Sequence, residues 1–195
     1  MSDKMKEIFL IGDSIRMAYE PAVRELLAEN YTVSAPKENC RFAANVFNSL
    51  RFWNASLKKA DVIHFNAGLW DIAVLYREDG CFTPLDWYMV TMEKIVRELK
   101  KFDAKLIFAT TTPCRPEKEA LPGPFPPPLY NRDVERYNEA ACALMAREGI
   151  IVNDLYSVVA PHIGEYICDD LTHPTDAGKA AIARAVADKI MEVTV

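Results

Sequence analysis

A serine near the N-terminus and an Asp-x-x-His motif near the C-terminus are the residues of this sequence best suited to chemistry. Ser14 closes a Gly-Asp-Ser run directly after an apolar stretch, and Asp170 stands three residues before His173 in a polar loop. A serine hydroxyl is a weak nucleophile near neutral pH, because it needs a base to take its proton and a group to orient that base. The pattern therefore favours a triad for acyl transfer, in which Ser14 attacks, His173 accepts the proton and Asp170 orients the imidazole.

Each of these short patterns also has a simpler interpretation. The Gly-Asp-Ser run could be no more than a helix-capping turn, and an isolated Asp-x-x-His motif is common by chance. The other two histidines are weaker candidates for the base. His64 lies within an apolar stretch, where a buried core histidine is the more common case. His162 has no paired acid, and we interpret it as structural or solvent-exposed.

The elements that must position Ser14 can be inferred from the apolar runs. Residues 8–11 are all apolar and end at Gly12, which indicates a buried strand that leads into a tight turn. Further strands are expected at 31–35, 62–65, 105–109 and 150–152. Stretches with helical spacing lie between these runs, and we expect helices at 20–29, 46–57, 85–101, 133–148 and from the Asp-x-x-His loop to 191.

This alternation of strand and helix predicts an α/β fold, in which a parallel sheet has helices on both faces. We expect a three-layer α/β/α sandwich with five parallel strands in the flavodoxin-like order 2-1-3-4-5. Ser14 would then lie at the carboxyl end of the first strand, where open parallel sheets place their ligands. The stretch from Pro113 to Pro128 holds more than half of the twelve prolines, so we expect a long surface loop at that edge. A linker between domains is the alternative.

Composition limits the possible partners. A chain of 195 residues, half of them hydrophobic, is most simply one domain over 1–195. The net charge of -5 and the lack of a basic run make nucleic acid an unlikely partner. Five cysteines without a Cys-x-x-Cys pair, and only three histidines, give no expectation of a bound metal. The odd cysteine count, with no leader and no bilayer-spanning segment expected, favours the cytoplasm. The oligomeric state is left open.

The sequence resembles the SGNH, or GDSL, hydrolase family over nearly its whole length. The family's first block carries the nucleophilic serine, which matches the Gly-Asp-Ser run ending at Ser14. Its last block is Asp-x-x-His before the final helix, which matches the motif from Asp170 to His173. The resemblance implies a metal-independent serine esterase that needs no cofactor. It also implies small acyl esters as substrates, such as acetyl groups on carbohydrates. A lipid or thioester hydrolase with the same triad, and a non-catalytic binding protein of the same fold, are the alternatives.

The two middle blocks of the family match less regularly. In the second block a glycine N–H helps to bind the oxyanion, and Cys40 stands at the glycine's place. The third block is usually Gly-x-Asn-Asp, and here the third strand ends in Asn66-Ala67-Gly68-Leu69-Trp70-Asp71. We expect an oxyanion hole made of the Ser14 N–H, the Cys40 N–H and the Asn66 amide. Asn66 could also be a plain turn residue. Arg41 and Trp70 are expected to flank the substrate pocket, although both could equally pack on the surface.

Overall fold

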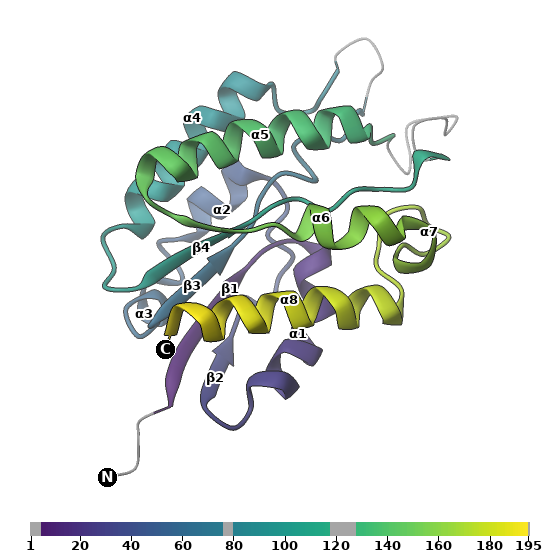
Figure 1. Ribbon diagram of the computed structural model, residues 1–195. Coiled ribbons are helices and arrows are strands. Elements are labelled where there is room, and N and C mark those ends of the chain that lie inside the picture. Colours follow the sequence, from purple (N-terminus) through teal and green to yellow (C-terminus); the bar gives the residue numbers. More distant parts are fainter. Residues whose placement is uncertain (1–4, 76–79, 118–127, 195) are drawn as a thin grey trace.

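The computed structural model describes residues 5–75, 80–117 and 128–194, and a five-stranded sheet lies at its centre (Figure 1). All neighbouring strands are parallel and pair in the order β2-β1-β3-β4-β5, so the predicted topology is confirmed. The strands are β1 (Lys6–Ile11), β2 (Tyr31–Ser34), β3 (Val62–Phe65), β4 (Lys105–Ala109) and β5 (Ile151–Asn153).

Helices cover both faces of this sheet (Figure 1). On one face α1 (Ser14–Leu27) packs along α8 (Asp176–Thr194), and α6 (Leu155–Val159), a 3₁₀ turn (Ala160–His162) and α7 (Ile163–Tyr166) lie beside them. On the other face α4 (Leu85–Leu99) packs against both α2 (Ala43–Ser49) and α5 (Asn131–Glu148), and the short α3 (Asn54–Leu57) follows α2. Among the described residues no helix is both long enough and apolar enough to cross a membrane.

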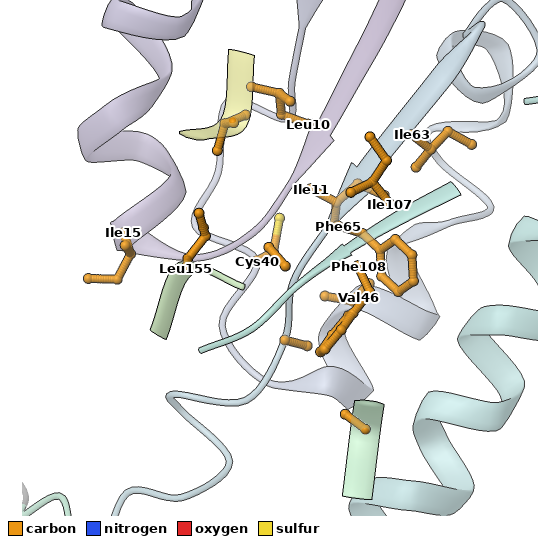
Figure 2. Close-up of a cluster of buried hydrophobic side chains, with 14 of the residues drawn as sticks. Leu10, Ile11, Ile15, Cys40, Val46, Ile63, Phe65, Ile107, Phe108 and Leu155 are labelled. Atoms are coloured by element: carbon orange, nitrogen blue, oxygen red, sulfur yellow. The ribbon is translucent and has the colours of Figure 1, made fainter. Parts of the chain in front are cut away.

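The core forms where the central strands meet these helices. Parallel strands flanked by helices on both faces are buried on both sides, and all four residues of β3 are indeed buried. Figure 2 shows strand residues such as Leu10, Ile63 and Ile107 together with Ile15 of α1 and Leu155 of α6. A fully buried aliphatic side chain contributes roughly 1.5–3 kcal/mol. The strand ends that carry the polar loops therefore rest on a close-packed and rigid base.

Two of the expected helices have different limits in the structure. The first helix begins at Ser14, not near residue 20, because the Asp13 carboxylate caps it by accepting the Ile15 N–H at 2.9 Å. Pro21 therefore lies inside the helix, not in its first turn. The stretch over 46–57 forms two short helices, α2 and α3, because the chain turns between Ser49 and Trp53.

The described parts of the proline-rich stretch join β4 to α5 without regular strands or α-helices. They comprise residues 113–117 and 128, and the central part of the predicted loop, 118–127, lies outside the described residues. The final helix was expected directly after the Asp-x-x-His loop, and α8 begins three residues beyond His173. The short helices between β5 and that loop were not predicted.

We predict that Gly178→Ala destabilises the protein. A Cβ at Gly178 would overlap the carbonyl oxygen of Tyr166, where α8 packs closely against the end of α7. Relieving such an overlap costs roughly 1–3 kcal/mol, which urea denaturation would measure. Gly164→Ala is the matched control, because a Cβ there meets nothing within 4 Å. Equal unfolding midpoints for the two variants would contradict this account of the packing.

Candidate active site

The structure brings the serine, the histidine and the aspartate into one hydrogen-bonded chain. Ser14 is the first residue of α1, directly beyond the carboxyl end of β1. Its Oγ lies 2.8 Å from His173 Nε2, and His173 Nδ1 lies 2.6 Å from Asp170 Oδ2. The two interpretations of the Gly-Asp-Ser run are therefore compatible, since Asp13 caps the helix while Ser14 faces the histidine.

The environment of Asp170 favours its ionised form. Partial burial acts to raise the pKa of Asp170, but hydrogen bonds to the carboxylate outweigh it and leave that pKa below its usual value. The second carboxylate oxygen, Oδ1, accepts the N–H groups of Thr172 at 2.9 Å and His173 at 2.8 Å. An ionised carboxylate at Nδ1 holds the ring proton there and leaves Nε2 free to accept the proton of Ser14.

The loop that carries Asp170 and His173 is closed on itself. An antiparallel bridge joins Ile167 to Pro174, and the Cys168 N–H donates to the His173 carbonyl at 2.8 Å. At the tip, Leu171 has a φ of 68°, a left-handed conformation that is uncommon for a branched side chain. The loop is therefore a compact element of defined shape, and its tip is strained.

The turn before Ser14 is held by a buried arginine that the sequence analysis did not single out. Arg16 is 3% exposed, pairs with Glu20, and donates to the carbonyls of Gly12 at 3.4 Å and Glu38 at 2.9 Å. A Cβ at Gly12 would come within 2.7 Å of the Arg16 side chain, so this approach requires glycine. Arg16 thus ties the turn before Ser14 to the loop after β2. Its position within a helix only emerges once that helix is known to begin at Ser14.

Cys40 and Asn66, which are expected to form the oxyanion hole together with Ser14, lie at the same edge of the sheet. Their hydrogen-bond donors already have acceptors. The Cys40 N–H donates to the Gly12 carbonyl over 3.3 Å. The Asn66 amide donates to the Ala109 carbonyl at 2.8 Å and, over a longer 3.3 Å, to Thr111 Oγ1. The N–H of Ser14, as the first residue of a helix, has no acceptor within that helix.

The residue after Cys40 has the backbone conformation that usually favours glycine. Arg41 has a φ of 52°, and its N–H donates to the Asn39 side chain at 2.9 Å. The Arg41 N–H is a donor in this loop that the sequence analysis did not consider.

Asp71 connects the loop after β3 to the loop after β2. Its carboxylate is fully buried and accepts the Ala43 N–H at the start of α2 at 2.9 Å. Burial raises the pKa of Asp71 from 3.8 to about 6. Gly68 and Asp71 have the spacing of the glycine and aspartate of a Gly-x-Asn-Asp block, with Trp70 at the asparagine's place. Gly68 also packs so closely that a Cβ would come within 2.5 Å of the Thr111 hydroxyl.

Arg41 and Trp70, the two expected substrate-binding residues, lie against each other. The Arg41 guanidinium is 5.7 Å from the centre of the Trp70 ring. Phe42 packs edge-on against Trp70 at 5.5 Å and stacks on the half-exposed Phe82 at 4.5 Å. The loops after β2 and β3 therefore share one aromatic surface with a cation over it.

The other two histidines, His64 and His162, contact neighbouring side chains away from Ser14. His64 is completely buried in β3 beside the Asn153 amide, 3.3 Å away, and burial lowers the pKa of His64 to about 4. His162 packs on the Tyr166 ring. Within the described ranges, no group of three or more His, Cys, Asp or Glu side chains is placed to hold a metal ion.

Comparison with known proteins identifies the class of protein. The model of the GDSL-like lipase/acylhydrolase family matches residues 10–181. The chain therefore belongs to this family and is a carboxylic ester hydrolase. The matched range includes the Gly-Asp-Ser run and the Asp-x-x-His loop, which confirms the family resemblance. A search of curated proteins found no match.

Solved structures of low sequence identity share the fold. A lipase/acylhydrolase from Enterococcus faecalis superimposes with a TM-score of 0.78 at 16% identity, over 97% of both chains. An acetylxylan esterase from Geobacillus stearothermophilus gives 0.75 at 17% identity, over 97% of this chain and 96% of that one. A further acetyl xylan esterase gives 0.74 at 16% identity, over 97% and 100%.

We predict that the wild-type protein loses stability as the pH rises because Asp71 ionises, and that Asp71→Asn does not show this loss. With the folded pKa near 6 and the ordinary value at 3.8, the folded state holds this proton more tightly than the unfolded chain. The contribution of Asp71 to stability is therefore present below pH 3.8 and is lost as the pH rises to about 6, at up to about 1.4 kcal/mol per pH unit. Asparagine can still accept the Ala43 N–H but does not ionise.

The measurement is urea denaturation of both proteins at several pH values. The free energy of unfolding of Asp71→Asn should rise relative to that of the wild type across this range and level off above it. A difference that does not change with pH would show that Asp71 ionises normally in the fold.

Proposed function

We propose that this esterase hydrolyses small acyl esters, with Ser14 as nucleophile, His173 as base and Asp170 as the group that orients His173. The observation that carries the proposal is the hydrogen-bonded chain from Ser14 Oγ through the imidazole to Asp170. These are the contacts that general-base activation of a serine requires.

The proposed reaction has two steps of the same form. Ser14 Oγ bonds to the ester carbonyl carbon while its proton moves to His173 Nε2, and the alcohol leaves with that proton. Water then attacks the acyl-serine, gives a proton to His173, and the acid leaves as Ser14 recovers its proton. In both steps Asp170 stabilises the imidazolium that forms. This scheme needs neither a metal nor a cofactor.

We propose Ser14, Cys40 and Asn66 as the donors to the oxyanion. The Ser14 N–H is available as the first N–H of a helix. The bonds from the Cys40 N–H to Gly12 and from Asn66 to Thr111 are both 3.3 Å long, so each donor could turn toward a charged oxygen with little loss. The shorter bond from Asn66 to Ala109 would meanwhile keep the amide in place.

Acetyl esters on carbohydrates are the substrates we propose. Two of the structurally similar proteins are esterases of acetylated xylan. The surface of Trp70, Phe42 and Phe82 offers aromatic faces of the kind on which sugar rings stack, and Arg41 beside it could donate hydrogen bonds to sugar hydroxyls. The half-exposed Phe82 would equally accept a longer acyl chain, which keeps lipid or thioester hydrolysis as the second candidate.

A panel of p-nitrophenyl esters from acetate to palmitate separates these two candidates. We expect kcat/KM to be highest for acetate and to fall with chain length. Release of acetate from acetylated xylo-oligosaccharides would then support the carbohydrate assignment. A maximum at long chains would assign the enzyme to lipid substrates. A wild-type protein that neither hydrolyses esters nor reacts with a fluorophosphonate probe would be a binding protein.

We predict that Ser14→Ala lowers kcat by at least about 10³-fold and abolishes fluorophosphonate labelling, since no other group replaces the nucleophile. The fold should be unchanged, as judged by circular dichroism. Ser56→Ala, at an exposed position of α3, is the control and should keep wild-type activity. Near-wild-type turnover by a correctly folded Ser14→Ala protein would overturn the nucleophile assignment.

We predict that Asn66→Ala lowers kcat by roughly 10²–10³-fold with little change in KM, because a donor to the oxyanion acts only once the charge has formed. Asn138→Ala is the matched control. Asn138 also holds Thr111, by accepting its N–H and donating to its carbonyl, both at 2.8 Å. Equal losses of kcat in the two variants would mean that Asn66 only supports the end of β4 and does not donate to the oxyanion.

A further inference from the structure

Arg115 reaches from the connection after β4 to the loop that carries Asp170 and His173. Its backbone N–H donates to the Leu171 carbonyl at 3.0 Å. Its guanidinium donates to the Gly164 carbonyl at 2.9 Å and approaches the Asp169 carboxylate at 3.4 Å. One residue thus binds both the tip of the loop and the short α7 that precedes it.

The loop needs a contact of this kind. Leu171 adopts a left-handed conformation, which is unfavourable for a non-glycine residue and persists only where the surroundings enforce it. The carbonyl of this strained residue accepts the backbone N–H of Arg115. The side chains of Asp170 and His173 are 51% and 43% exposed, so burial alone fixes them only in part.

The three contacts of Arg115 differ in how strongly they can hold the loop in place. The Asp169 side chain is fully exposed, and exposed ion pairs contribute little. The Gly164 carbonyl is bound by the guanidinium, on a side chain that is 23% exposed, whereas the Leu171 carbonyl is bound by the backbone N–H of Arg115. Backbone acceptors do not rotate away, so these two bonds define where the loop lies.

We propose that Arg115 is a positioning residue that holds the Asp170–His173 loop in the register where the imidazole meets Ser14. This role rests on the proposed function, because the geometry it maintains is that of the proposed triad. Arg115 acts through the loop and does not touch the reacting atoms. Displacing a catalytic group by about 1 Å can lower a rate by up to about 100-fold.

The test compares Arg115→Met, Arg115→Lys and Arg97→Met. Methionine keeps the length of the side chain and the backbone bond to Leu171 but removes the guanidinium bonds to Gly164 and Asp169, whereas lysine keeps the charge and can reach only one acceptor at a time. Arg97 of α4 is the matched control, because it is exposed and has a similar ion pair at 3.6 Å to Glu98. Each protein is assayed with p-nitrophenyl acetate and for the rate of fluorophosphonate labelling, well below its melting temperature.

We expect kcat and the labelling rate to fall together by about 10- to 100-fold in Arg115→Met, with KM changed less than about twofold. Arg115→Lys should fall between Arg115→Met and the wild type, and Arg97→Met should match the wild type. Wild-type kcat in Arg115→Met, or a change confined to KM, would overturn the proposal. If Arg115→Met does not fold, the same comparison is decided on Arg115→Lys.

A second readout does not depend on turnover. Long-range ¹H–¹⁵N spectra at alkaline pH report which nitrogen of each imidazole carries the proton, and His64 and His162 serve as internal references. We expect one tautomer of His173, with the proton on Nδ1, in the wild type and in Arg97→Met, and a mixture in Arg115→Met. The same pure tautomer in Arg115→Met would overturn the proposal. An inactive and unlabelled wild type would instead count against the proposed function alone.

Discussion

The hydrogen bond between Ser14 and His173 joins residues from opposite ends of the chain, and the arrangement of the fold serves to bring these ends together. Ser14 begins α1, and His173 lies just before α8. These two helices pack along each other on one face of the sheet, as Figure 1 shows. A shift of either helix would move one of the two partners. The geometry of the site therefore depends on the packing of α1 against α8 as much as on the loop that carries Asp170 and His173.

Buried polar groups hold the remaining loops at this edge of the sheet. Arg16 binds the loop after β2, Asp71 caps α2, and Asn138 holds the chain after β4. Removing such groups from water is unfavourable, and each is compensated by backbone hydrogen bonds. The pKa of Asp71 is raised and that of His64 is lowered, both by burial. The two shifts change stability with pH in opposite directions and partly cancel between about pH 4 and 6.

The sequence predicted those features that depend on local patterns. The alternation of strand and helix gave the strand order, and the motifs around Ser14 and His173 indicated which residues to expect together. Features that depend on distant contacts and that no motif marks were not predictable. Arg16 lies in a stretch that was predicted to be a connection before the first helix. Nothing in the sequence therefore indicated that its side chain is buried. Arg115 lies in a proline-rich stretch, and its link to Leu171 appears only in three dimensions. The engagement of Asn66 with Ala109 likewise arises from the pairing of β3 with β4.

Trp70 has consequences for how negative charge can be stabilised in this enzyme. An asparagine at its position would offer an amide with two hydrogens, whereas the indole of Trp70 has a single N–H and a large apolar face. In the proposed oxyanion hole Asn66, four residues earlier, supplies the side-chain donor, and one of its amide hydrogens is bound to Ala109. The other two donors of the proposed oxyanion hole are backbone N–H groups, those of Ser14 and Cys40. Trp70 itself forms part of an aromatic surface with Phe42 and Arg41. With Trp70 at this position, the proposed oxyanion hole relies more on backbone N–H groups, and the aromatic surface is the one proposed to bind the rest of the substrate.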